Sequence, residues 1–299
     1  MNSVLKGYLQ LMRPANLPTA AADILAGITI ILYLRNIDVL TFLSDHGGVV
    51  LLLVLSSVAL YAGGVVFNDV FDAKLDAIER PERAIPSGRV LKRNAIVFGT
   101  ILMFVGVALA FKCTLLSGII SVILSTAILT YDGYFKQFGI AGPLNMGICR
   151  GLNLLLGMSI LGSLTHWYIS LVPVVYIFAI TLISRGEVHG DNKKHIVWAG
   201  ILYAIVIFSI ALIVMQQKDN LLVLLPFLLL FGFLIYSPLI KAYKENSPKN
   251  IKKAVMGGVL SLVVMNACWV AGFSNWYLAL AFLLLLPLSM LLSKLFAVT

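Results

Sequence analysis

Four side chains whose oxygen atoms can bind a metal ion follow an apolar run over residues 49–67: Asn68, Asp69, Asp72 and Asp76. On a helix, the three aspartates stand at i, i+3 and i+7 and therefore share one face. Three like charges side by side near a bilayer repel one another, so something cationic must neutralise them. Carboxylate and amide oxygens suit Mg²⁺, which commonly bridges protein carboxylates to substrate phosphates. The alternative is an acidic, solvated helix end at the membrane surface, and the amide and a second acidic pair downstream favour the metal site.

The second acidic pair follows the apolar run over residues 168–184. Glu187 and Asp191 stand at i and i+4, so they share a face if the helix continues through them. Gly186 and Gly190 weaken that assumption, because glycine disfavours a helix interior. His189, between the two acids, could be a ligand or a base, although a lone histidine at a membrane surface is more often neither.

Basic residues and turn signals come after the first acidic group. Arg80 and Arg83 could hold a diphosphate by forked hydrogen bonds, and the alternative is ordinary loop charge. Pro81 should end the helix that carries the aspartates. The Pro86-Ser87-Gly88 sequence is typical of a turn.

Further polar residues lie in or beside two central apolar runs. Tyr131 could belong to an interfacial aromatic belt, and Lys136 could be either a membrane anchor or a phosphate ligand. Arg150 and Asn153 share a helix face, and an arginine inside a bundle should line a polar cavity or meet an anion. Asn145 and Asn153 could equally be helix-packing contacts. Asp23, the only acid well inside the first apolar run, should face the bundle interior.

The composition indicates a membrane protein. The chain has 299 residues, 60% hydrophobic and 12% charged, whereas soluble domains have about 25% charged residues. Ten apolar runs have nearly membrane-spanning length: 17–34, 49–67, 95–111, 115–131, 143–162, 168–184, 196–215, 221–240, 253–272 and 276–297. Because the runs are unbroken rather than alternating, they indicate helices and not a barrel. The runs predict an all-α bundle of up to ten transmembrane helices, with residues 1–299 forming a single domain.

The net charge of +9 is distributed as membrane topology requires. Basic residues concentrate in the loops after the second, fourth, sixth and eighth runs and near both termini, which places these parts in the cytoplasm. The acidic groups fall on the same side. We therefore expect a multi-pass protein of the cell (inner) membrane that contacts membrane lipid and no nucleic acid.

These motifs resemble the UbiA superfamily of intramembrane prenyltransferases, whose members have nine helices. The most specific element is Asn68-Asp69-x-x-Asp72-x-x-x-Asp76, followed by Arg80 and residues 86–88. Tyr131 and Lys136 match positions after the fourth helix, and Arg13, Pro14 and Asn16 look like the start of the first. Glu187 is a departure, since the family usually has aspartate there. The stretches 184–190 and 149–153 look like the UbiA-like EboC subgroup.

The resemblance implies Mg²⁺-dependent transfer of a prenyl group from a polyprenyl diphosphate to a lipophilic aromatic or lipid acceptor. The implied catalytic residues and metal ligands are Asp69, Asp72, Asp76, Glu187 and Asp191, with Asn68 as a further ligand. The implied substrate-binding residues are Asn16, Asn68, Arg80, Arg83, Tyr131, Lys136, Asn145, Arg150, Asn153 and Arg185.

Two other classes of membrane protein could carry some of these features. A transporter or channel would explain intramembrane charges such as Asp23 and Arg150, but not two acidic clusters on one face of the membrane. A CDP-alcohol phosphotransferase also uses clustered aspartates, but its D-G-x-x-A-R element is absent here.

Overall fold

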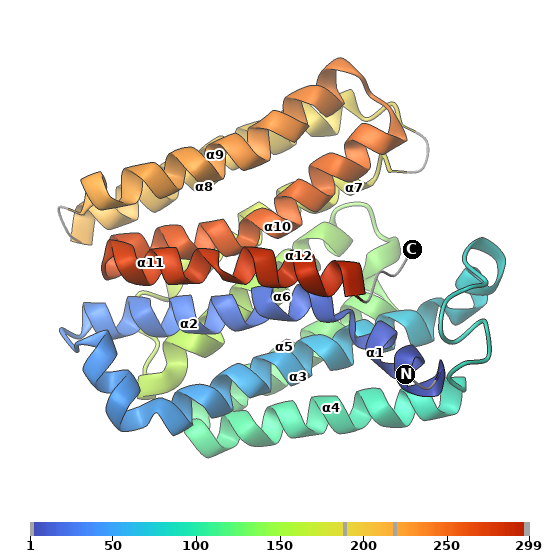
Figure 1. The fold of residues 1–299 in the computed structure, drawn as a ribbon, viewed down its shortest axis with the longest axis horizontal. Coiled ribbons are helices and arrows are strands. Elements are labelled where there is room, and N and C mark those ends of the chain that lie inside the picture. The colour runs from blue at the N-terminus through green and yellow to red at the C-terminus, as the bar shows by residue number, and fades with distance from the viewer. Residues whose placement is uncertain (1–2, 188–189, 218–219, 296–299) are drawn as a thin grey trace.

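A computed structural model describes residues 3–187, 190–217 and 220–295, the last three of them as backbone only (Figure 1). Within these residues the chain is helical and contains no strand, as the sequence predicts. The helices are α1 Ser3–Met12, α2 Leu17–Leu34, α3 Val39–Glu79, α4 Lys92–Cys113, α5 Leu115–Gly133, α6 Ala141–Met158, α7 Leu171–Ser184, α8 Lys193–Gln217, α9 Leu221–Lys244, α10 Pro248–Phe273, α11 Trp276–Leu283 and α12 Leu285–Leu295. Two short 3₁₀ helices, η1 Pro14–Asn16 and η2 Phe135–Gln137, border the site described below.

Nine helical segments of the described chain are long and apolar enough to cross a membrane, the first of them counted from Ser3 through Leu34. The tenth apolar run, over residues 276–297, is not one such helix: its described part forms α11 and α12. Pro287 accounts for the break, because its ring excludes the carbonyl of Leu283 and it offers no N–H to bond that group. Of the nine or ten transmembrane helices expected, the described part of the chain therefore contains nine.

From α2 to α10, successive helices run antiparallel, so the connections after α3, α5, α7 and α9 gather at one end of the bundle (Figure 1, right). In the same view, the α8–α9 hairpin forms one edge of the molecule and α4 forms the other. Helix α2 lies inside, against α3, α6 and α10, and its residues from Thr19 to Leu32 are mostly buried. An apolar helix that is covered on all sides is a core element, around which the other helices pack.

Helix α3 carries the first acidic group near its C-terminal end, and it is longer than a membrane span requires. Its 41 residues correspond to roughly 60 Å of helix, about twice the thickness of the hydrocarbon core. The helix is kinked at His46 (φ −123°, ψ 18°), and it ends at Glu79, just before Pro81, as predicted. Asp69, Asp72 and Asp76 therefore lie on continuous helix, with the shared face that their spacing implies.

The loop after α3 folds back against the bundle. Gly88 has a φ of 75°, and its N–H donates to the Ile85 carbonyl at 3.0 Å, which confirms the predicted turn. Ala84 and Val90 are buried in a small apolar cluster with Leu11 of α1. These contacts hold the loop against the helix that bears the aspartates.

Candidate active site

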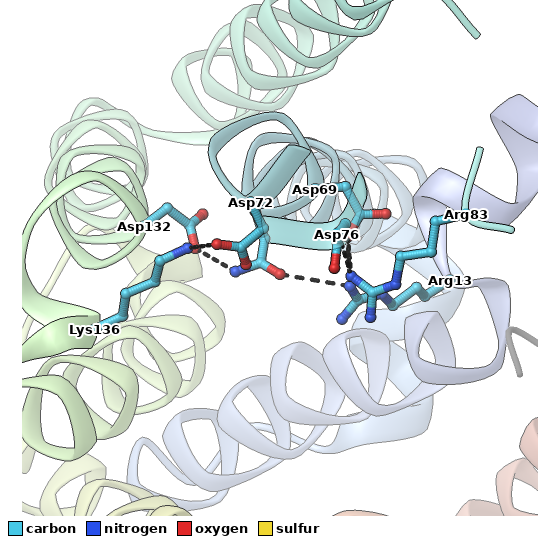
Figure 2. A network of polar contacts seen from close by, with 8 residues as sticks. Arg13, Asp69, Asp72, Asp76, Arg83, Asp132 and Lys136 are labelled. Atoms are coloured by element: carbon cyan, nitrogen blue, oxygen red, sulfur yellow. Dashed lines mark hydrogen bonds and ion pairs between the residues drawn. The ribbon is translucent and has the colours of Figure 1, made fainter. Parts of the chain in front are cut away.

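Two of the three aspartates share an arginine from the loop that follows their helix (Figure 2). Arg83 Nη1 lies 2.7 Å from Asp76 Oδ2 and 3.4 Å from Asp69 Oδ1. Asp69 also pairs with Arg13, whose Nη2 lies 2.6 Å from the same oxygen. The side chains of Asp69 and Asp76 are only 9% and 6% exposed, so these pairs supply the cationic neutralisation that buried carboxylates require.

The third aspartate, Asp72, is directed towards α5. It pairs with Lys136 of η2, and the two side chains remain 25% and 28% exposed. Figure 2 shows Lys136 on one side of the acidic face and Arg13 and Arg83 on the other. The acidic face of α3 thus has cationic partners on two sides. Arg13 and Lys136 come from distant parts of the chain, and Arg83 comes from the loop that follows α3.

Asn68 connects these two sides. Its Nδ2 donates to Asp132 Oδ1 at 2.8 Å, and its Oδ1 accepts from Arg13 Nη2 at 3.5 Å. Asp132, the penultimate residue of α5, is only 4% exposed. Sequence reasoning named its neighbour Tyr131 and overlooked Asp132, although an acid at the end of an apolar run needs a partner when it is buried.

A cavity of about 530 Å³ extends into the bundle beside this face, which it meets at Arg13, Asn68 and Asp132; Asp69, Asp72 and Asp76 are not part of its lining. Its lining is Arg13, Thr19, Ser57, Tyr61, Gly64, Val65, Asn68, Leu124, Ile128, Tyr131, Asp132, Met146, Cys149, Arg150, Asn153, Ile177, Ile180, Thr181, Ser184, Glu187, Val255, Val259 and Leu262. Because the helices are antiparallel, Asn68, Asp132 and Glu187 lie at its mouth, and Ser57 and Asn153 lie deeper. The walls between are mostly apolar, with Tyr61 and Tyr131 as aromatic members.

The inner part of the cavity borders a buried polar network. Asp23, 1% exposed, has Oδ2 at 2.6 Å from Arg150 Nε and accepts from Asn153 Nδ2 at 2.9 Å. Asn266 of α10 donates to its other oxygen at 2.7 Å, and Ser57 of α3 donates to Asn153 at 2.6 Å. Arg150 and Asn153 share a face of α6 as predicted, and the anion that Arg150 meets is Asp23. Asn266 and Ser57 were not singled out from the sequence.

The second acidic pair is not arranged on one helical face. Helix α7 ends at Ser184, and Gly190 and Asp191 both have positive φ angles of 72° and 51°. Asn192 then closes the helix end, since its Nδ2 donates to two carbonyls of the last turn at 2.8 and 3.2 Å. Glu187 lines the cavity, whereas Asp191 is exposed. The assumption of a continuing helix is therefore wrong, because the glycines allow the chain to turn away.

Glu187 is half-buried at the cavity mouth. Burial raises the pKa of its carboxyl group, and the charges of Lys252 and Arg80 oppose that rise. Arg80, although itself exposed, is thus close enough to act on the mouth of the cavity. His189 lies outside the described residues.

The remaining residues expected to bind substrate lie around the cavity rather than in it. Asn145 joins α5 to α6: its Nδ2 donates to Thr130 at 3.4 Å, so its helix-packing interpretation holds. Asn16 ends η1, where its backbone carbonyl accepts from Thr19 at 2.7 Å. Arg185 is exposed at the end of α7.

The donor set at the α3 face fits Mg²⁺ by its chemistry, since Asn68, Asp69, Asp72 and Asp76 offer only oxygen ligands of the preferred kind. Among the described residues, no three Asp, Glu, His or Cys side chains converge in a ready-made metal cluster. The cause is visible in the contacts: the aspartate oxygens are drawn towards Arg13, Arg83 and Lys136. A metal at this face would compete with these cations for the same oxygens.

Fold and site together define a helical membrane protein with an apolar cavity beside a face of aspartates that form ion pairs with Arg and Lys side chains. The UbiA prenyltransferase family matches residues 39–196, which is more than half of the chain, so this chain belongs to that family.

Similar proteins include digeranylgeranylglyceryl phosphate synthases. The chain is 33% identical to the one from Methanosarcina mazei over 199 residues, which are 64% of this chain and 66% of that protein. It is also 33% identical to the one from Sulfolobus acidocaldarius over 185 residues, 62% of each chain. The matches thus span slightly less than two thirds of these relatives.

Solved structures agree with the fold over most of the chain. A structure of a digeranylgeranylglyceryl phosphate synthase has a TM-score of 0.67 at 22% identity, covering 91% of this chain and 99% of that one. A UbiA homologue from Archaeoglobus fulgidus bound to GPP and Mg²⁺ has a TM-score of 0.62 at 14% identity, covering 88% and 99%. The UbiA-like architecture expected from the sequence is confirmed.

Proposed function

We propose that the protein transfers a prenyl group from a polyprenyl diphosphate to a lipophilic acceptor, with Mg²⁺ as cofactor. The observation that carries the proposal is that two environments adjoin. An apolar cavity of about 530 Å³ includes Arg13, Asn68 and Asp132 in its lining, and through Arg13 and Asn68 it borders the ion-paired aspartates of α3. A prenyl diphosphate has the same division, with a hydrocarbon chain at one end and a highly charged group at the other.

A buried donor at this face supports an anionic ligand. Within the described residues, Arg83 Nε is buried and has no hydrogen-bond partner. An unsatisfied buried donor costs about 1–3 kcal/mol, so an acceptor that paired with Arg83 Nε would stabilise the site. A diphosphate oxygen is a suitable acceptor, because guanidinium groups bind phosphates by forked, charge-assisted hydrogen bonds.

The acidic and amide side chains would bind the metal, and the cationic side chains would bind the diphosphate. Asn68, Asp69, Asp72 and Asp76 would hold Mg²⁺, with Glu187 and Asp191 as the second acidic group. Bound Mg²⁺ would supply charge neutralisation that makes the diphosphate a better leaving group. Arg80, Arg83, Lys136 and Arg185 donate to the diphosphate from the same end of the bundle.

The cavity walls protect the reacting carbon. Once the allylic C–O bond weakens, positive charge develops on the prenyl chain, and water must be kept away from it. Apolar side chains from five helices exclude water, and Tyr61 and Tyr131 present aromatic rings that stabilise a nearby cation. Arg150 and Asn153 provide the polar inner boundary.

The acceptor is proposed from the relatives. Their name describes the synthesis of a glycerophosphate lipid, so we propose an acceptor of the glycerophosphate lipid class. The charge distribution supports a site that faces the cytoplasm, because the loops and helix ends on this side of the bundle carry most of the Lys and Arg residues. Both termini would lie on that side of the cell membrane.

The test is product identification. Membranes containing the protein are incubated with labelled geranylgeranyl or farnesyl diphosphate and a lipid extract, and labelled lipids are identified by mass spectrometry. We expect a Mg²⁺-dependent prenylated glycerophosphate lipid that is missing from membranes without the protein. Label that remains in the diphosphate under all conditions would contradict the proposal.

A further inference from the structure

We infer that Asp132 is a positioning residue, which turns the Asn68 amide so that its carbonyl oxygen faces Arg13 at the acidic face of α3. This inference rests on the proposed function, in which Asn68 is a metal ligand. The juxtaposition that carries it is the 2.8 Å hydrogen bond between Asn68 Nδ2 and Asp132 Oδ1 at the cavity mouth.

Two neighbours determine the orientation of the Asn68 amide. A carboxylate can only accept hydrogen bonds and a guanidinium can only donate them. Asp132 therefore selects the NH₂ group of Asn68, and Arg13, at 3.5 Å from Oδ1, selects its carbonyl oxygen. The reversed amide would place oxygen against carboxylate and NH₂ against guanidinium, so both contacts would become repulsive.

The surroundings of Asp132 leave it free for this task. Lys136, Asp72 and Arg13 are the charged groups that act on it. Lys136 forms its ion pair with Asp72, and Arg13 forms its own with Asp69. Asp132 is 4% exposed, and its carboxylate accepts a hydrogen bond from Asn68 Nδ2 at 2.8 Å. Hydrogen bonds to an ionised carboxylate are stronger than those between neutral groups.

The orientation matters because only one end of an amide binds a hard cation. The carbonyl oxygen is a ligand for Mg²⁺ and the NH₂ group is not. Without Asp132 the amide can rotate, and metal binding must then select the correct rotamer. Partners that orient a metal ligand without touching the metal typically change affinity 10- to 100-fold.

The test is a double-mutant cycle on metal affinity in the purified full-length protein. Mn²⁺ binding is measured by electron paramagnetic resonance in the presence of inorganic diphosphate, together with the Tm of each variant. The variants are Asp132→Ala, Asn68→Ala and their combination. Asp45→Asn, an exposed acid at the other end of α3, is the matched control for loss of charge.

If Asp132 acts through Asn68, Asp132→Ala weakens Mn²⁺ binding about 10-fold or more in the wild type, and by less than about 2-fold when Asn68 is already alanine. Asp132→Asn keeps a carbonyl that accepts from Asn68, so it should stay within about 3-fold of the wild type. This variant preserves the volume of the side chain and decides the question if Asp132→Ala does not fold.

Additive losses in the cycle would overturn the inference, because Asp132 would then act on the metal independently of Asn68. A folded Asp132→Asn variant as weak as Asp132→Ala would overturn it too, as would wild-type affinity in Asp132→Ala. Wild-type protein that binds no Mn²⁺ would contradict the proposed function as well, whereas normal wild-type binding with an additive cycle would contradict the inference alone.

Discussion

Arg13 Nη2 and Asp69 Oδ1 lie 2.6 Å apart across 56 residues of sequence, joining the turn before α2 to the acidic face of α3. The backbone of Arg13 is left-handed, with a φ of 46° and a ψ of 66°. A non-glycine residue pays roughly 1–2 kcal/mol for this conformation, and such strain persists where the surroundings hold it in place. Helix α12 packs against the adjacent η1 and adds to that support.

Arg13 also lines the cavity, so we expect its guanidinium to contribute to diphosphate binding in addition to the four cations named above. We expect Arg13→Ala to raise KM for the prenyl diphosphate about 10- to 100-fold, which corresponds to the loss of a hydrogen bond between charged groups. Lys6→Ala, an exposed residue of α1 with the same charge, is the control and should change KM little. Steady-state kinetics on both variants checks this. An equal rise of KM in both variants would assign the effect to surface charge, and an unchanged KM in Arg13→Ala would contradict the prediction.

A second comparison concerns two lysines at the same end of the bundle. Lys136 pairs with Asp72 at the acidic face, whereas Lys249 is exposed at the start of α10. We expect Lys136→Ala to weaken binding of the prenyl diphosphate at least about 10-fold more than Lys249→Ala does. Equilibrium binding of a non-hydrolysable analogue measures the difference. If the two variants are equally weak, general electrostatic attraction, not the position of Lys136, governs binding.

The two acids of the second group, Glu187 and Asp191, should differ in their contribution to kcat/KM. Glu187 lines the cavity and Asp191 is exposed beyond a glycine turn. We expect Glu187→Ala to lower kcat/KM at least about 10-fold further than Asp191→Ala, because only Glu187 is held at the mouth without rearrangement of the loop. Initial rates at several Mg²⁺ concentrations provide the test. A larger loss in Asp191→Ala than in Glu187→Ala would contradict this ranking of the two acids.

The buried pair of Asp23 and Arg150 predicts a non-additive effect on stability. Removing one member of a buried pair leaves an unpaired charge and costs about 3–5 kcal/mol, whereas removing both costs less. We expect Arg150→Met to lower the Tm in detergent more than the combination of Asp23→Asn and Arg150→Met does. Thermal unfolding of the two variants checks this, and a double variant that is less stable than the single one would contradict it.

Local patterns in the sequence predicted the features that depend on neighbouring residues. The spacing of Asp69, Asp72 and Asp76 gave their common face, and Pro81 marked the end of their helix. The i, i+3 spacing likewise placed Arg150 and Asn153 together. Pro287 could have revealed the break between α11 and α12, because proline interrupts a helix by a local mechanism.

Long-range partners could not be predicted in this way. Asn153 and Asp23 are separated by 130 residues, and nothing in either segment identifies the other. Asp132 looked like one more polar residue at a helix end until its contact with Asn68 was visible. The prediction that Asp191 shares a face with Glu187 failed because of local backbone structure. The i, i+4 spacing places two residues on one face only in a helix, and the chain is not helical at Gly190 and Asp191, where φ is positive.

The central claim is that the acidic face of α3 binds Mg²⁺ in order to activate a prenyl diphosphate. Its most direct test measures release of inorganic diphosphate from geranylgeranyl diphosphate by protein in lipid bilayers with acceptor lipid, as free Mg²⁺ is varied. The account predicts release that rises with Mg²⁺, stops in excess chelator, and is lost in Asp72→Ala. That variant should keep the wild-type Tm, because the Asp72 side chain is 25% exposed. Undiminished release in excess chelator, or from Asp72→Ala, would contradict the account.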